Sequence, residues 1–377
     1  MSFYHSVMSK KFQRRSLFRK KPSFRSRYSY LLRLLLAVVA LLLTLYAAIF
    51  LLPVIPNVTN IPADSKALPK ESASYKVKIL PQSGLSTISR QLVDQGIETY
   101  PIVFQIAARA IFVGTSLKPG TYLLPLNASL GNVILQIARG DRIRESIAII
   151  PGMTIWQLRA VIDAHPALIH QTKGMSNKQL LQSLNLNYPS DEGIFFPDTY
   201  IFDPDDSDLF IYRRAAQAMQ KQLNAAWELR DIKTPLKTPY ELLILASIIE
   251  KETGRSSDRP LVASVFINRL NINMPLQTDP TVIYGIGPRF DGNLRKTDLR
   301  KDTPYNTYMR KGLPPTPIAM PSKESLRAAV QPAQSNALYF VSRGDGTSQF
   351  SKSLSEHENA VDRYQRKQVA LSRKTTQ

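Results

Sequence analysis

Residues 239–253 read PYELLILASIIEKET, an apolar helical segment that ends with two glutamates. Its apolar positions recur at helical spacing and predict a buried stripe made by Leu242, Leu245, Ile248 and Ile249. Glu250 follows at the edge of this stripe, where partial loss of solvent would favour a protonated carboxyl that can donate its proton. Glu252 lies about 200° further around the helix and cannot share this face. A solvated helix end is the alternative reading of Glu250.

The segments around this helix combine apolar runs with loops rich in polar side chains. VASVFINRL at 262–270 reads as a second buried helix, and LQTDPTVIYG at 276–285 alternates polar groups with turn formers. Loops dense in amide, hydroxyl and carboxyl groups beside an acid are what a polyhydroxyl ligand would require. The aromatic run EGIFFPDTY at 192–200 suits a sugar-binding wall, with a packed loop between two domains as the alternative.

Six strings of residues together resemble one enzyme family. EGIFFPDTY, IIEKET, VASVFINRL, LQTDPTVIYG, PYNTY and GLPP, in this order within about residues 75–365, resemble the MltG/YceG-like endolytic murein transglycosylases. The resemblance implies a lytic, non-hydrolytic cleavage of MurNAc-β-1,4-GlcNAc bonds within nascent peptidoglycan strands, which leaves 1,6-anhydro-MurNAc ends. It also implies peptidoglycan synthases as partners, and a reaction that needs no metal and no organic cofactor.

The resemblance assigns the chemistry to a few residues. The family's catalytic glutamate falls on Glu250, as general acid to the glycosidic oxygen and then as base to the muramyl C6 hydroxyl, which attacks C1. Because that hydroxyl replaces water, one carboxyl suffices where ordinary glycosidases use two. The groove residues that match the family motifs are Gln277, Thr278, Asp279, Tyr284, Tyr305 and Asn306. Asp279, which precedes Pro280, is equally typical of a turn.

Two other functions stay open at this point. A hydrolytic muramidase would use Glu250 as acid and Asp279 to orient a water molecule, whereas a non-catalytic anchor would only bind peptidoglycan. Two positions near the carboxyl end bear on the resemblance. Ser348, two residues before Phe350, stands where the family often has a histidine, and His357 matches the family's final EHN-like element. We interpret His357 as structural.

An apolar segment near the amino terminus has the length of a membrane span. Residues 34–52 read LLLAVVALLLTLYAAIFLL, without a charge, which is about 28 Å of helix against a bilayer core of roughly 30 Å. The segment is longer than the apolar part of a cleaved signal peptide, the alternative, so we expect a retained single-pass anchor. The positive-inside rule places the amino terminus in the bacterial cytoplasm and all later residues outside the inner (plasma) membrane.

The formal charge of +20 arises from 49 basic and 29 acidic residues, and half of it precedes or borders the apolar segment. The ten basic residues there are Lys10, Lys11, Arg14, Arg15, Arg19, Lys20, Lys21, Arg25, Arg27 and Arg33. Topology and attraction to anionic membrane lipid explain them, which argues against nucleic acid as a partner. The absence of cysteine excludes disulfides, thiolate zinc sites and cysteine nucleophiles. His165 and His170 are poorly spaced for a metal pair.

The sequence after the apolar segment, which is expected to lie outside the membrane, predicts an α+β fold. Three times, a short β-like run is followed by a proline, a Ser or Thr suited to be an N-cap, and a segment of helical period. The three copies are residues 75–80 with Ser86, 122–124 with Ser129, and 147–150 with Thr154, and Gly140 is expected to end the second helix. By the resemblance this region is LysM-like and contacts peptidoglycan; simple packing without a ligand is the alternative.

The predicted organisation is a single amino-terminal transmembrane helix, a LysM-like α+β module and a mixed α/β catalytic domain. The boundaries are residues 1–33 for the basic cytoplasmic segment, 34–52 for the membrane helix, 53–74 for a proline-rich linker, 75–145 for the LysM-like module, 146–235 for a connecting α+β region, 236–366 for the catalytic domain and 367–377 for a polar tail.

Overall fold

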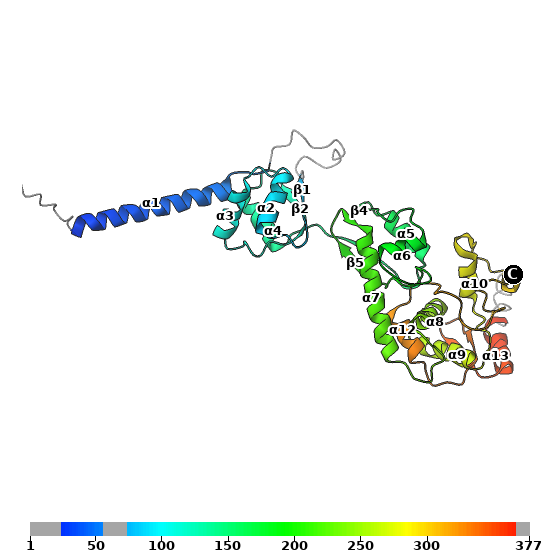
Figure 1. Cartoon of the computed structure of the whole chain (residues 1–377). Helices are drawn as coiled ribbons and strands as arrows, with labels where there is room; N and C mark the ends of the chain where they lie inside the picture. Colours follow the sequence, from blue (N-terminus) through cyan, green and yellow to red (C-terminus); the bar gives the residue numbers. More distant parts are fainter. Residues whose placement is uncertain (1–23, 56–73, 367–377) are drawn as a thin grey trace, which may run out of the picture. The chain divides into compact units, whose positions relative to one another are not determined.

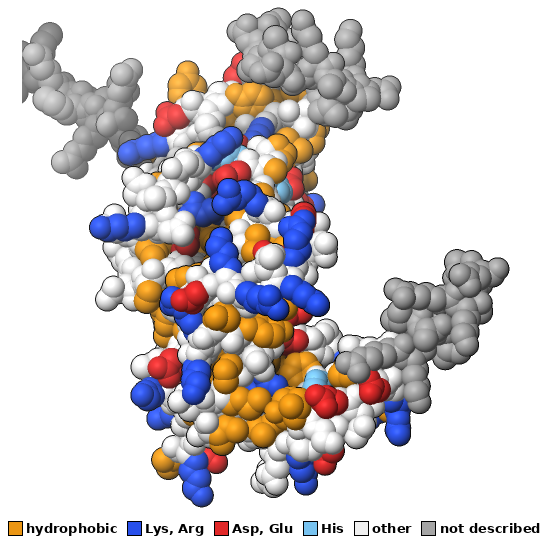
Figure 2. Space-filling view, turned by 90° about the vertical axis from the view of Figure 1, so that its right-hand side faces the viewer, with side chains coloured by type: hydrophobic (Ala, Val, Ile, Leu, Met, Phe, Trp, Pro, Cys, Tyr) orange, Lys and Arg blue, Asp and Glu red, His pale blue; other side chains and the backbone are white. Residues whose placement is uncertain are grey.

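The computed structural model of the chain is a mixed α+β structure with two compact units, which divide between Arg142 and Ile143 (Figure 1). The described residues are 24–55 and 74–366, so residues 1–23 of the expected cytoplasmic segment, 56–73 of the expected linker and the tail 367–377 lie outside them. On the face displayed in Figure 2, basic side chains are interspersed with acidic and hydrophobic ones.

The first unit contains a β-α-α-β arrangement that is extended by one helix at each end. Its elements are α1 (Phe24–Leu51), β1 (Ser74–Ile79), α2 (Leu85–Asp94), α3 (Pro101–Ala110), β2 (Gly120–Pro125) and α4 (Leu130–Arg139). β1 and β2 pair antiparallel, with Ser74 opposite Pro125 and Ile79 opposite Gly120. Val77, Phe104 and Tyr122 are fully buried between this two-stranded sheet and the helices.

The local signals of this unit were partly predicted. The Ser129 hydroxyl accepts a hydrogen bond from Asn132 N at 3.3 Å, and Gly140 ends α4 with a φ of 81°, so both caps of this helix are confirmed. The expected cap at Ser86 was wrong, because α2 already begins after Gly84. α3 was not predicted. It makes the first two copies of the pattern one β-α-α-β unit instead of two repeats.

The end of α1 packs against the rest of the first unit. Ile49 and Ile55 are buried in the core of the unit, and the amide of Val54 donates to Ala128 O at 3.0 Å. Of the expected linker, Val54 and Ile55 are therefore buried against the folded unit, whereas residues 56–73 lie outside the described residues. The rest of α1 carries exposed apolar side chains over Tyr28–Leu51, long and apolar enough to cross a membrane.

The second unit combines short two-stranded sheets with a helical core. Its elements are β3 (Glu145–Ala148), α5 (Ile155–Asp163), β4 (Leu168–Ile169), α6 (Asn177–Ser183), β5 (Thr199–Phe202), β6 (Asp206–Ser207), α7 (Asp208–Glu228), α8 (Pro239–Glu252), α9 (Arg259–Asn271), α10 (Asp279–Ile286), a 3-10 turn (Gly287–Arg289), α11 (Lys296–Arg300), α12 (Lys323–Val330), β7 (Tyr339–Ser342), β8 (Ser348–Ser351), α13 (Leu354–Val361) and a final turn (Asp362–Arg366). β3 pairs antiparallel with β5, β7 antiparallel with β8, and β4 parallel with β6.

α8 lies at the centre of the second unit. The predicted stripe is confirmed, and every residue from 242 to 249 is buried because α7, α9 and α12 all pack against this helix. Thr238 caps its start by accepting from Glu241 N at 3.1 Å, and Pro239 occupies the first turn. One continuous hydrophobic core includes residues from both 146–235 and 236–366. The end of α8, which carries Glu250, is therefore anchored in a closely packed core.

Candidate active site

The Glu250 carboxylate lies at the end of α8 and is fixed mainly through one oxygen. Oε2 accepts hydrogen bonds from Ser322 N at 2.8 Å, from Ser325 Oγ at 2.7 Å and from the Ser322 hydroxyl. Oε1 faces the Arg259 guanidinium, with Nη2 at 3.2 Å. The Glu250 side chain is only 6% exposed. This group is therefore an ordered, nearly buried acid and not the solvated helix end that was the alternative.

The segment that holds Glu250 belongs to the start of α12. Ser322 is the N-cap of this helix, and its hydroxyl also accepts from Ser325 N at 3.3 Å. The N-terminal end of a helix presents free amide hydrogens and a partial positive charge, which stabilises a nearby anion. Glu250 thus joins the C-terminal turn of α8 to the N-terminal turn of α12, while Arg259 approaches from the start of α9.

A tight turn brings the beginning of α5 against the same helix end. Gly152 has a φ of 80°, a conformation that favours glycine, and a Cβ added to it would lie 4.0 Å from Glu250 Cγ. Gly152 N donates to Met320 O at 2.9 Å, and Met320 N donates to Met153 O at 2.8 Å. These bonds align the turn with the segment that leads into α12.

A second carboxyl, Glu192, is fully buried at the start of α5. Its Oε2 accepts from Ile155 N at 2.9 Å and its Oε1 from Gly193 N at 3.1 Å. Burial raises the pKa of Glu192 to about 8, although the two backbone amides and the Tyr284 hydroxyl partly oppose this shift. Glu192 therefore binds a proton at neutral pH and is a neutral acid next to Tyr284.

Three aromatic rings form a row beside Glu192. The centroids of Trp156 and Tyr284 are 4.9 Å apart, and those of Tyr284 and Tyr305 are also 4.9 Å apart. The Tyr305 hydroxyl shares a 2.8 Å hydrogen bond with Thr316 Oγ1, and burial raises the pKa of Tyr284. The structure thus brings together the predicted residues Tyr284 and Tyr305. Trp156 was missed by the sequence reading, although an aromatic residue at a predicted helix start was visible there.

The predicted residues 277–279 reach the other glutamate of α8. The Thr278 hydroxyl donates to the Glu252 carboxylate, and burial raises the pKa of Glu252. Asp279 is exposed and accepts from the Tyr308 hydroxyl at 2.5 Å. Gln277 is exposed, with a φ of 48°. Thr278 is 3% exposed, so of these three only Gln277 and Asp279 present side chains to a ligand in solution.

Asn306 has a different position from the one expected for a groove residue. It is fully buried, and its amide nitrogen donates to three backbone carbonyls, those of Asp298 at 3.2 Å, Leu299 at 3.0 Å and Lys301 at 2.7 Å. Its amide oxygen accepts from Tyr308 N at 2.9 Å. The amide therefore holds the loop after α11 in place, and direct contact with a ligand is closed to it.

Comparison with known proteins decides the family. The model of the YceG-like family matches residues 77–363. The chain belongs to the YceG-like family, as the sequence strings predicted. An endolytic murein transglycosylase of Bacillus subtilis is 42% identical over 182 residues, 48% of this chain and 49% of the relative. Proteins of the same name from Streptococcus pneumoniae are 26% identical over 325 residues, 77% of this chain and 58% of theirs.

This YceG-like chain therefore spans about half the length of the Bacillus relative that it matches. The crystal structure of a yceG-like protein from Listeria monocytogenes aligns with 76% of the chain and 99% of its own length, at 28% identity and a TM-score of 0.48.

The aromatic run 192–200 of this YceG-like chain is mostly packed inward. Phe195 is fully buried and lies edge-on against Tyr212, with ring centroids 5.1 Å apart. Tyr200 is nearly buried, and its hydroxyl donates to Phe196 O at 2.8 Å. These contacts favour the packed-loop alternative over a sugar-binding wall. The contribution of this run to the site is Glu192.

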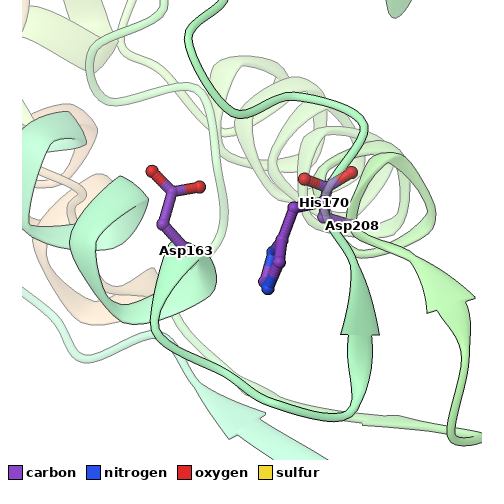
Figure 3. A group of neighbouring side chains, drawn as sticks. All are labelled: Asp163, His170 and Asp208. Atoms are coloured by element: carbon purple, nitrogen blue, oxygen red, sulfur yellow. The ribbon is translucent and has the colours of Figure 1, made fainter.

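Figure 3 shows three neighbouring side chains of the second unit: Asp163, His170 and Asp208. One ligand atom of each lies within 4.8 Å of the others, a spacing that a metal ion could bridge. The Asp208 oxygens, however, already accept from Gln171 N at 3.1 Å, Leu209 N at 2.8 Å, Thr172 N at 3.0 Å and Thr172 Oγ1 at 2.6 Å. We interpret Asp208 as the residue that ties β4 to the start of α7. His165 packs against Phe202 instead.

Ser348 and His357, the two positions noted near the carboxyl end, both contact other residues of the second unit. Ser348 N donates to Asp258 Oδ2 at 3.0 Å. The His357 ring stacks on Tyr339 at 5.2 Å, Arg269 lies over the same tyrosine at 5.2 Å, and burial lowers the pKa of His357. A cavity of about 1000 Å³ lies elsewhere in this unit. Its lining comes from the end of α7 and the loop after it, from α9, from residues 330–336 and from Lys352, and it includes none of the predicted site residues.

Proposed function

We propose that this chain is a membrane-anchored endolytic murein transglycosylase, which cleaves MurNAc-β-1,4-GlcNAc bonds within nascent peptidoglycan strands. The observation that carries the proposal is the Glu250 carboxyl, which is almost buried and fixed through Oε2 by Ser322 and Ser325. The names of the Bacillus and Streptococcus relatives support the same activity.

The proposed reaction uses Glu250 twice. In the first step Glu250, in its protonated form, gives its proton to the glycosidic oxygen. The bond between C1 and that oxygen breaks with its electron pair going to the oxygen, so positive charge develops at C1 and Glu250 is left as a carboxylate. Arg259 and the donors at the start of α12 are already in place to stabilise the negative charge of this carboxylate. In the second step the carboxylate takes the proton of the muramyl C6 hydroxyl, whose oxygen bonds to C1. The product is a 1,6-anhydro end, no water is consumed, and the nucleophile is held within the substrate.

The residues of the candidate site divide into proposed ligand contacts and supports. The row of Trp156, Tyr284 and Tyr305 offers ring faces on which sugar rings can stack, and the exposed Gln277 and Asp279 offer polar contacts. Thr278 and Asn306 act on the loops behind them. They are positioning residues in this proposal.

The first unit is proposed to be a LysM-like module that contacts peptidoglycan. Its β1-α2-α3-β2 order and its antiparallel strand pair support this assignment. A cavity of about 630 Å³ lies between the start of α2 and the segment from Arg109 to Leu117. Phe112 lines this cavity with a φ of 58° and is 93% exposed, so an aromatic ring is available to a glycan there.

The membrane placement is part of the same proposal. α1 is the retained anchor, the amino terminus is cytoplasmic, and the folded units lie outside the inner membrane, where nascent strands and peptidoglycan synthases are found. A reporter fused to the carboxyl terminus tests this placement. Activity of a reporter that works only in the cytoplasm would contradict it.

The test of the reaction is mass spectrometry of the products that the full-length protein releases from glycan strands. Anhydro-muramyl ends are the expected products, and reducing MurNAc ends would establish the hydrolytic muramidase instead. Glu250→Gln should abolish cleavage, whereas Glu228→Gln, at an exposed position of α7, should leave it unchanged. Undiminished cleavage by Glu250→Gln would refute the role of Glu250. Absence of cleavage by the unmodified protein would favour a non-catalytic anchor.

A further inference from the structure

α3 is apolar on the side that faces away from the protein as well as on the side that faces the core. Its sequence PIVFQIAARA contains only two polar residues, Gln105 and Arg109. Phe104, Ala107 and Ala108 form the buried side. The exposed side comprises Ile102, Val103 and Ile106, which are 58%, 43% and 49% exposed, and Tyr100, which is 75% exposed just before the helix. We refer to Tyr100, Ile102, Val103 and Ile106 as the α3 apolar face.

Such a face needs an explanation in a soluble environment. A helix at the surface of a water-soluble domain usually has one apolar stripe and a polar opposite side, whereas one that is apolar all round is buried or lies in a membrane. Contiguous exposed apolar side chains mark a surface that binds a partner or lipid. The α3 apolar face carries no acidic residue.

The position of α3 identifies lipid as the occupant. α1 and α3 both pack against α4, and the amide of Glu98, three residues before α3, donates to Val54 O at 2.7 Å, three residues after α1 ends. Figure 1 shows α3 at the end of the unit from which α1 leaves, with β1 and β2 further from α1. The candidate membrane span and the α3 apolar face thus belong to one compact unit.

The length of α1 sets the depth of this contact. The nineteen residues between Arg33 and Pro53, all but the last of them in α1, span about 28 Å and match the hydrocarbon core of a bilayer. With Arg33 at the cytoplasmic surface, Pro53 lies at the outer surface, and Val54 and Glu98 lie next to it. α3 is then at the level of the lipid headgroups, where amphipathic helices bury an apolar face about 5–10 Å into the boundary.

We infer that α3 is an interfacial membrane helix, whose apolar face inserts into the outer leaflet and holds the first unit on the bilayer. The inference rests on the proposed role of α1 as a retained anchor. Tyr100 has the character of the aromatic residues found at membrane surfaces. The cavity proposed for glycan is lined by Ser83–Leu85 and Arg109–Leu117, so the α3 apolar face remains free for lipid.

The experiment measures how deeply single side chains enter the bilayer. The chain has no cysteine, so single cysteines can be labelled with an environment-sensitive fluorophore without other changes. The full-length protein is reconstituted into vesicles of phosphatidylethanolamine and phosphatidylglycerol, with lipids whose acyl chains carry a quencher. Ile106→Cys tests the α3 apolar face, and Leu123→Cys, at an exposed apolar position of β2, is the matched control. Leu42→Cys, in the middle of α1, tests the anchor itself.

Quenching of the Ile106 probe several-fold above that of the Leu123 probe, together with strong quenching at Leu42, is the expected result. Equal, weak quenching at Ile106 and Leu123 with strong quenching at Leu42 would overturn the inference and leave the anchor intact. Equal, strong quenching at both would also overturn it, because the whole unit would then adhere without a preferred face. A Leu42 probe that lipid does not quench would refute the membrane span and, with it, the inference.

Discussion

Glu192→Gln tests the buried acid beside the proposed active site. The pKa of Glu192 is about 8 in the folded chain, against about 4.3 for an unperturbed glutamate. Between these two pH values the folded state binds more protons at this site than the unfolded state does. Stability must therefore fall as pH rises through this window, by the linkage of proton binding to folding. The glutamine variant has no proton to lose and lacks this contribution.

The magnitude follows from the same two values. Each pH unit within the window is equivalent to about 1.4 kcal/mol. Between pH 6 and pH 9 the unmodified chain should therefore lose about 3 kcal/mol more of its unfolding free energy than Glu192→Gln does. Solvent screening does not reduce this value much, because Glu192 is fully buried and its Oε2 accepts from Ile155 N at 2.9 Å.

The assay is urea unfolding of the full-length protein in detergent micelles at a series of pH values. Both tryptophans of the chain, Trp156 and Trp227, belong to the second unit, so their fluorescence follows the unfolding of that unit. Glu228→Gln, at an exposed site, is the control and should show the pH dependence of the unmodified protein. If the difference between the unmodified chain and Glu192→Gln stays constant from pH 6 to pH 9, Glu192 does not titrate in this range and the reasoning is refuted.

Three further substitutions test the supports of the structure. Ser325→Ala removes a donor from Glu250 and should lower kcat about 10- to 100-fold with little change in KM, as product release measures; a change confined to KM would contradict this role. Asn306→Ala should lower the unfolding free energy by about 2–4 kcal/mol in the urea assay, against less than about 0.5 kcal/mol for the exposed Asn293→Ala, and equal losses would contradict the loop-holding role. Gly131→Ala would place a Cβ 2.5 Å from the Phe50 ring and should weaken the packing of α1 on α4 by about 1–3 kcal/mol, visible as faster amide exchange in α4. Unchanged exchange would show that the ring can move aside.

The sequence predicted the helix of the site better than its surroundings. The periodicity over 239–253 identified the buried stripe, because local spacing determines which side chains share a helix face. Burial of the other faces of α8, such as Leu243 and Ile244, results from packing by α7, α9 and α12. The spacing of apolar residues within one helix does not show which other helices will pack against it.

The partners of Glu250 were not predicted for the same reason. Ser322 and Ser325 lie 72 and 75 residues downstream of it. The local pattern of these serines indicates only a helix N-cap before an apolar run. Asn306 was expected to face a ligand because its neighbours in the sequence match the family's motifs. The side-chain amide of Asn306 instead donates to backbone carbonyls of residues 298–301. A motif match gives no information about such contacts.

The surroundings of Glu250 also explain why a single carboxyl can serve both steps of the proposed reaction. The acid step leaves a negative charge that must be stabilised before the C6 hydroxyl returns a proton. Ser322 N at the start of α12 and the Arg259 guanidinium are oriented toward the two carboxylate oxygens before any substrate binds. Such preorganised donors cost no reorganisation when the charge develops. The negative charge on Glu250 is therefore stabilised by fixed groups at the starts of α12 and α9. The same carboxylate then serves as the base of the second step without moving from the position where it acted as the acid.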